Sequence, residues 1–296
     1  MLHRIALAAA LCLLPAAPWA LAPPEAGQER EDVERLEAWP ELPKDAKKGL
    51  KTQIERLRKA RTEEMGRSAH AELVAMGAGA APQLLVKLGK EKDEAAAARI
   101  EAVLAAVTGA AHTRLLAAEF GHRSQAVRIW TLERVAGFPD AGTREAAESA
   151  LQRAGKVAEP EKADRREHLA AALATTAAGS LEGLEHLHAR ARKAWGKHGA
   201  RMRAALEGVR GPDATRAVSA KLSGDREAKI AALRLLAGCG DDGAKARIKP
   251  FLADNDNSLR IAAINALRGI VDGDPPLERL PVFEAIELAK KWQARV

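Results

Sequence analysis

Four segments of this chain share one pattern, and their recurrence constrains the fold more than any other feature of the sequence. They are RIEAVLAAVTG from residue 99, RIWTLERVAG from 128, KIAALRLLAG from 229 and RIAAINALRG from 260. Each opens with a basic residue and Ile, has an aliphatic residue three positions after that Ile, and ends at Gly. This is the apolar stripe of a short helix with a glycine stop. Neighbouring copies are about 30 residues apart, and the central gap has room for roughly two more.

Another short amphipathic segment precedes each of these helices. The four segments are APQLLVKLG (81–89), AHTRLLAAEFG (111–121), PDATRAVSAKL (212–222) and AKARIKPFL (244–252). The repeating unit is therefore helix, polar turn, helix and glycine turn. The chain is 47% hydrophobic but only 3% aromatic, with alanine dominating the apolar share. Because alanine is the best helix former, the composition predicts an all-α fold with thin helix-helix interfaces.

This unit resembles the HEAT repeat, and most of all the short HEAT-like repeats of the phycobilisome-lyase type. The resemblance covers about residues 63–272 and implies a right-handed α-solenoid of about six HEAT-like helix pairs. It carries no bilin-lyase activity over to this chain, because the sequence shows no chromophore-handling residues.

In that family an Asp in the turn within each pair and an Arg six residues later form a hydrogen-bonded ladder along the stack. Asp93 with Arg99, and Asp254 with Arg260, match this spacing. The same basic position is taken without the matching acid by Arg128 and by Lys229. The resemblance therefore implies a structural ladder with gaps.

Amphipathic segments flank the repeats and predict capping helices, which a stack of repeats needs at both ends. Upstream, residues 23–62 contain two charged helical segments, EREDVERLEAW and KDAKKGLKTQIERLRKA, separated by the helix-breaking PELP. The second segment would cover the first repeat with the stripe Leu50, Ile54 and Leu57. Downstream, residues 273–296 comprise a linker and a helix that would cover the other end with Phe283, Ile286 and Trp292.

Residues 1–22 have the parts of a secretory signal: Arg4, an apolar stretch and an Ala-Leu-Ala cleavage site. Because Pro23 is a poor first residue for the mature chain, cleavage a few residues earlier is the alternative. The apolar run is too short, and too interrupted by proline, to cross a bilayer. We therefore expect a periplasmic or secreted protein without a transmembrane segment.

The stretch DNDNSLRIAAINALRG begins with oxygen-bearing side chains spaced as in a calcium loop. Such a loop needs Gly at its sixth position and Glu at its twelfth. Counting from Asp254, these positions hold Leu259 and Asn265. The stretch is better explained as a polar turn in which Asp256 or Asn257 caps the next helix.

Other motifs give no support for catalysis, a metal or a cofactor. His186 and His188 are two residues apart, which places them on different helix faces rather than in a zinc site. Cys12 would leave with the signal, so Cys239 has no disulfide partner. The sequence contains no nucleophile elbow, haem attachment motif or phosphate-binding glycine loop. We expect a protein that is not an enzyme and binds neither metal nor cofactor.

The segment RARKAWGKHGARMR, residues 190–203, combines many basic residues with Trp195 and contains no acid. We expect two cationic helix segments joined by the Gly-Lys-His-Gly turn. Either they form a patch for an anionic partner with Trp195 stacking on a ring, or they are a solvated surface with Trp195 in the core. The cations are Arg190, Arg192, Lys193, Lys197, Arg201 and Arg203.

Trp130 and Arg134 are a second candidate, one helical turn apart. In HEAT-like stacks the second helix of each pair lines the concave face, where an exposed Trp beside Arg would anchor an interface. The alternative is a Trp130 that packs against the flank of a neighbouring helix.

These observations predict a monomeric, exported protein-interaction scaffold with a concave repeat surface. The alternative is a binder of an anionic envelope polymer or lipid through residues 190–203. A third hypothesis, an enzyme whose site is assembled from separate repeats, has no sequence motif behind it. The net charge of +7 favours anionic partners, but the basic residues are too dispersed to indicate nucleic acid.

Overall fold

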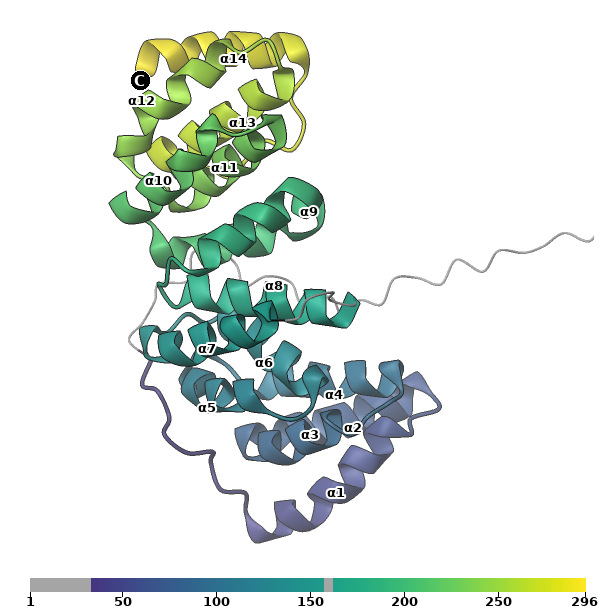
Figure 1. The fold of residues 1–296 in the computed structure, drawn as a ribbon. Coiled ribbons are helices and arrows are strands. Elements are labelled where there is room, and N and C mark those ends of the chain that lie inside the picture. Colours follow the sequence, from purple (N-terminus) through teal and green to yellow (C-terminus); the bar gives the residue numbers. More distant parts are fainter. Residues whose placement is uncertain (1–32, 157–161) are drawn as a thin grey trace, which may run out of the picture.

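The computed structural model describes residues 33–156 and 162–296, shown in colour in Figure 1. Those ranges contain fourteen α-helices and no β-strand, which confirms the predicted all-α fold. The predicted signal sequence, residues 1–22, and Cys12 lie outside them. The helices are α1 Lys44–Arg58, α2 Glu63–Ala75, α3 Ala81–Leu88, α4 Glu94–Val107, α5 Thr113–Ala117, α6 Gln125–Ala136, α7 Arg144–Gly155, α8 Lys162–Ala177, α9 Gly183–Leu206, α10 Pro212–Ser219, α11 Arg226–Cys239, α12 Lys245–Ile248, α13 Asn257–Leu267 and α14 Val282–Arg295.

Short 3-10 turns extend or connect many of these helices. They are Gly77–Ala80, Ala110–His112, Ala118–Gly121, Ala141–Thr143, Glu207–Val209, Ala220–Ser223, Asp242–Ala244 and Lys249–Ala253, and a π-helical turn follows at Arg268–Asp272. No single helix in the described ranges is long and apolar enough to cross a membrane. One pair of segments with a bend between them, Glu94–Val107 and Ala110–Gly121, reaches that length and composition together.

From α3 onward most helices associate in pairs that are consecutive in sequence. Within each pair the first helix packs on the second. These pairs are α3 with α4, α5 with α6, α7 with α8, α10 with α11 and α12 with α13. The second helices also contact one another in series, α6 with α8, α8 with α9, α9 with α11 and α11 with α13. Figure 1 shows the pairs following one another in chain order, from α1 at one end of the molecule to α14 at the other.

Helix α9 consists of two arms that supply both helices of the fourth pair. Ala194 has a non-helical backbone (φ −146°, ψ 32°) and separates the arms. Gly183 of the first arm lies against α8 near Thr176, and Gly208, just beyond the second arm, lies against Ala177 at the end of α8. The two arms therefore run antiparallel. Two cationic segments form as predicted, but the bend is not at Gly-Lys-His-Gly, because Gly199 is buried within the second arm beneath the Trp195 ring.

The glycines that end the four repeated segments do not all stop helices. Gly137 is the C-cap of α6, as predicted, but Gly238 lies within α11 and Gly269 lies in the π-helical turn after α13. A Cβ atom at Gly269 would be 2.3 Å from the Ala237 carbonyl oxygen. Glycine at this position therefore allows the close approach of consecutive second helices.

The two ends of the stack are covered by α1 and α14. Leu50, Ile54 and Leu57 of α1 are buried, as predicted for a helix that caps the first pair. In α14, Trp292 is buried, but the prediction that Phe283 also packs on the stack is wrong, since 73% of its side chain is exposed. Phe283 lies in the first turn of α14, whose buried residues are Ala285, Ala289 and Trp292.

Residues 33–43, here called the N-terminal strap, do not form the charged helix predicted for this part of the chain. The strap instead makes contacts with later repeats. The Leu36 amide donates a hydrogen bond to the Ala111 carbonyl oxygen (2.9 Å), and the Trp39 ring stacks on His112 with centroids 5.7 Å apart. An extended backbone is needed for these contacts, because a helix would use the same amide internally.

Candidate binding surface on the second helices

The basic segment 190–203 lies around the bend of α9, and several of its cations are already engaged. Arg190 donates to the Arg165 carbonyl oxygen (3.1 Å), and Arg192 pairs with Asp225 (2.7 Å). Arg201 pairs with Glu133 of α6 (3.2 Å). By contrast, Lys193 and Lys197 are exposed, and their side chains form no hydrogen bond or ion pair with the described residues. The patch therefore presents fewer free charges than its sequence indicates.

Trp195 is partly buried and packs against the core, and two arginines lie over its ring. The guanidinium carbon of Arg203, from the same arm, is 5.8 Å from the ring centroid. That of Arg234, from α11, is 5.6 Å from it. Burial lowers the pKa of both arginines, and the charge of Glu278 partly opposes this effect at Arg203. The Trp195 ring therefore packs on the core, as one of the two alternatives expects, while its stacking on the ring of a partner stays a prediction.

Sequence reasoning missed Arg234 as a member of this cluster. Its signal was an isolated charge inside the apolar run IAALRLLAG of the third repeated segment. The partner ring lies in a different repeat, and the sequence pattern contains no information on that contact.

A second charged cluster gathers around Glu133, which lies between cations of two other second helices. Arg166 of α8 approaches its carboxylate to 2.8 Å and Arg201 of α9 to 3.2 Å. Burial raises the pKa of Glu133, but the hydrogen bond from Arg166 and the charge of Arg201 outweigh this, and the pKa is lowered. Glu101 of α4 is within electrostatic range of Glu133 and Arg166, and burial raises its pKa.

Trp130 and Arg134 do not form the exposed pair that was one of two predictions for them. Only 3% of Trp130 is exposed, so its expected role as an interface anchor is wrong and the packed alternative holds. Arg134 donates to the carbonyl oxygens of Ala105 (2.6 Å) and Thr108 and lies over the Phe138 ring. The reason is that α6 packs against helices on more than one side, which buries residues around most of its circumference.

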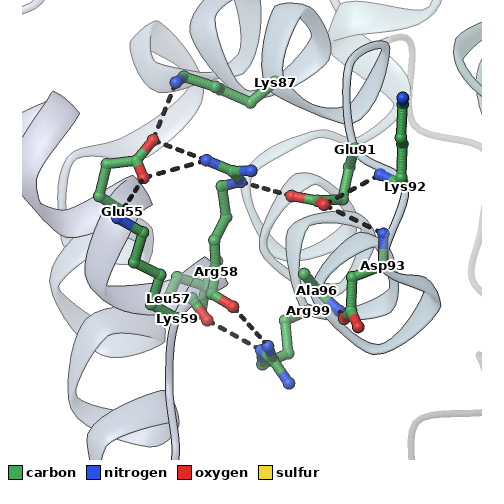
Figure 2. Close-up of polar contacts among 10 residues, drawn as sticks. All are labelled: Glu55, Leu57, Arg58, Lys59, Lys87, Glu91, Lys92, Asp93, Ala96 and Arg99. Atoms are coloured by element: carbon green, nitrogen blue, oxygen red, sulfur yellow. Dashed lines mark hydrogen bonds and ion pairs between the residues drawn. The ribbon is translucent and has the colours of Figure 1, made fainter.

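The side-chain ladder implied by the HEAT resemblance does not form between the matched residues. Figure 2 shows that Asp93 accepts from the Ala96 amide (2.6 Å), whereas Arg99 donates to the main-chain oxygens of Leu57 and Arg58 (2.8 and 2.7 Å).

The other ladder positions also differ from the predicted pairing. Arg260 reaches the main-chain oxygen of Asp254 (2.7 Å) rather than its carboxylate. Arg128 donates to the His122 carbonyl oxygen (2.8 Å) and pairs with Glu167 of α8 (2.7 Å). The Lys229 side chain has no hydrogen bond or ion pair within the described ranges; only its main-chain amide donates, to the Asp225 carbonyl oxygen (3.0 Å).

Acids and arginines instead connect consecutive pairs along the edge where the turns within each pair lie. Arg58 of α1 pairs with Glu91 in the turn before α4 (Figure 2). Arg192 pairs with Asp225, which caps α11, and Arg226 pairs with the α13 cap residue Asp256. Two of the helix-capping acids, Asp225 and Asp256, thus bind arginines from the preceding pair.

The histidines and Cys239 have structural surroundings. His186 meets the ring of His168 edge to face (centroids 4.6 Å apart), and His188 Nε2 lies 3.0 Å from the Ala228 carbonyl oxygen. In the described part of the chain no three His, Cys, Asp or Glu residues are placed to hold a metal ion. Burial raises the pKa of the Cys239 thiol to about 12.

No family model, curated protein or solved structure matches this chain. The likeness to HEAT repeats therefore rests on the repeated residues.

Proposed function

We propose that this protein is a non-catalytic scaffold, a right-handed α-solenoid of HEAT-like pairs that binds a partner protein on the face of its second helices. The signal-like residues 1–22 support a location in the periplasm or outside the cell. Each helix pair leaves apolar surface that the next pair covers, and such stacks produce long surfaces for recognition.

One observation carries this proposal: charged side chains of four different second helices come together although they are far apart in sequence. Glu101, Glu133, Arg166 and Arg201 belong to α4, α6, α8 and α9, and they interact electrostatically. A cluster built across repeats is a feature of the stack rather than of any single repeat. It supplies polar groups of both signs, which favours a partner with complementary charges.

Site-specific photo-crosslinking tests the proposal. A photoreactive residue replaces Ala204, which is exposed on the second arm of α9 beside Arg201 and Arg203. The matched control replaces Ala217, an exposed alanine of the first helix α10. In living cells we expect a discrete protein adduct at position 204 and none at 217. Equal adducts at both positions, or none at 204, would contradict a partner on the second-helix face.

A second candidate function, binding of an anionic envelope polymer or lipid, is favoured by the two exposed lysines 193 and 197. Their charges are uncompensated by the described residues, so they are available to an anionic surface. Binding of the protein to vesicles that contain an anionic lipid should then fall steeply as the salt concentration rises. It should also fall in the variant Lys193→Glu plus Lys197→Glu. Unchanged binding of that variant would exclude this function.

A further inference from the structure

We infer that Trp195, Arg203 and Arg234 form a site for a carboxylate carried by an acidic polypeptide segment. The site joins the second arm of α9 to α11, since the two guanidinium groups that lie over the Trp195 ring come from these helices. This inference rests on the proposed function, because it specifies which side chains of the partner the second-helix face recognises.

The first argument is that both arginines are half-buried without a counter-ion. Neither the Arg203 nor the Arg234 guanidinium group donates a hydrogen bond or forms an ion pair within residues 33–156 and 162–296. Arg134, also half-buried, differs from them because it donates to main-chain oxygens. Charged groups withdrawn from water without an acceptor are costly, and an anionic ligand would relieve that cost. The same withdrawal from water lowers the pKa of both arginines.

The second argument concerns the shape of the groups. A guanidinium presents a planar fork of N–H donors that matches a carboxylate in two parallel hydrogen bonds. The Trp195 ring supplies an apolar surface beside that fork, on which the methylene groups of a Glu side chain can pack. An acidic residue of a polypeptide carries both parts in one side chain.

The third argument is that the chain already places an acidic, non-helical segment near the site. Residues 273–281, between the π-helical turn and α14, contain Glu278, whose negative charge acts on Arg203. The Glu278 carboxylate accepts no hydrogen bond from Arg203, so it leaves the donors of the guanidinium available. Glu278 is therefore a weak internal competitor, and its neutralisation should improve binding of an external acidic segment.

Isothermal titration calorimetry with a blocked tetraglutamate peptide tests this site on the full chain. The variant Arg203→Gln plus Arg234→Gln should weaken binding at least about tenfold. The matched control, Lys51→Gln plus Lys90→Gln, removes the same charge from exposed positions in α1 and in the turn before α4 and should change affinity less than about threefold. Glu278→Gln should bind more tightly than the natural sequence. This substitution of an exposed residue keeps the test valid if the double arginine variant fails to fold.

Three outcomes would overturn the inference. The first is an equal loss of affinity in the arginine and the lysine double variants. The second is binding of tetraglutamine as tight as that of tetraglutamate, and the third is competition by inorganic phosphate at the same concentration as the peptide. The crosslink at position 204 separates the two proposals. If it persists in the double arginine variant, the scaffold stands and this carboxylate site fails. If the natural protein shows no crosslink, the scaffold proposal fails whatever the peptide does.

Discussion

The Arg226 guanidinium donates to both carboxylate oxygens of Asp256, which also caps the next helix of the stack by accepting from the Ser258 amide (2.7 Å). Replacement of Asp256 by Ala removes the cap and the ion pair together and should lower the free energy of unfolding by about 1–2 kcal/mol. Asp256→Asn keeps a capping side chain and should cost less than about 1 kcal/mol. Urea unfolding of the two variants measures both values. Equal losses would show that the cap contributes nothing beyond the ion pair.

The carboxylate of Glu55 makes stability at the α1 end depend on pH. The hydrogen bond from Lys87, with that from Arg58, lowers the pKa of Glu55 to about 2 (Figure 2). Because the unfolded chain has a Glu pKa of about 4.3, the contribution is complete above that pH and is lost as the pH falls toward about 2. Chemical unfolding between pH 2 and 7 should therefore show Glu55→Gln less stable at neutral pH, with the difference shrinking in acid. A pH-independent difference would contradict this account.

Gly269 permits the close contact between α11 and the turn after α13. Gly269→Ala should lower the unfolding free energy by about 1–3 kcal/mol, because the new Cβ meets the Ala237 carbonyl oxygen. Gly109→Ala is the control, since nothing lies within 4 Å of its Cβ position and the backbone there is extended. Its change should stay within about 0.5 kcal/mol. Similar losses in both variants would argue against the contact.

Trp130 contributes to stability rather than to an interface. Trp130→Ala should lower the unfolding free energy by about 3–5 kcal/mol, because it leaves a cavity beside a side chain that is 3% exposed. Trp130→Phe fills part of that space and should cost less. Thermal melts of the three proteins provide the comparison, and an unchanged melting temperature for Trp130→Ala would contradict the burial.

Cys239 should resist thiol reagents in the folded protein. Its thiol is buried and donates to the Leu235 carbonyl oxygen, and burial raises its pKa to about 12. Iodoacetamide at pH 8 should modify it at least ~100-fold more slowly in native buffer than in urea. Mass spectrometry of the peptide that contains Cys239 distinguishes it from Cys12. Rapid native labelling would show that this part of α11 opens readily.

Many helix positions and some caps were predictable from the sequence, because both depend on residues close together in the chain. The apolar stripe around Ile261 and Ile264 predicted the helix that forms as α13, and the polar turn before it predicted the cap that Asp256 supplies. Gly137 ends α6 for the same local reason. The all-α class follows from the repetition of such segments.

Contacts between repeats were decided by the tertiary structure alone. The sequence contains both Trp130 and the helices that bury it, but only their packing determines that the ring is inaccessible. In the same way, Arg226 meets an acid of the next repeat, and Arg234 reaches a ring on α9. A helical pattern sets which residues share one face of one helix. How helices separated by about 30 residues or more place those faces against each other depends on the geometry of the whole stack.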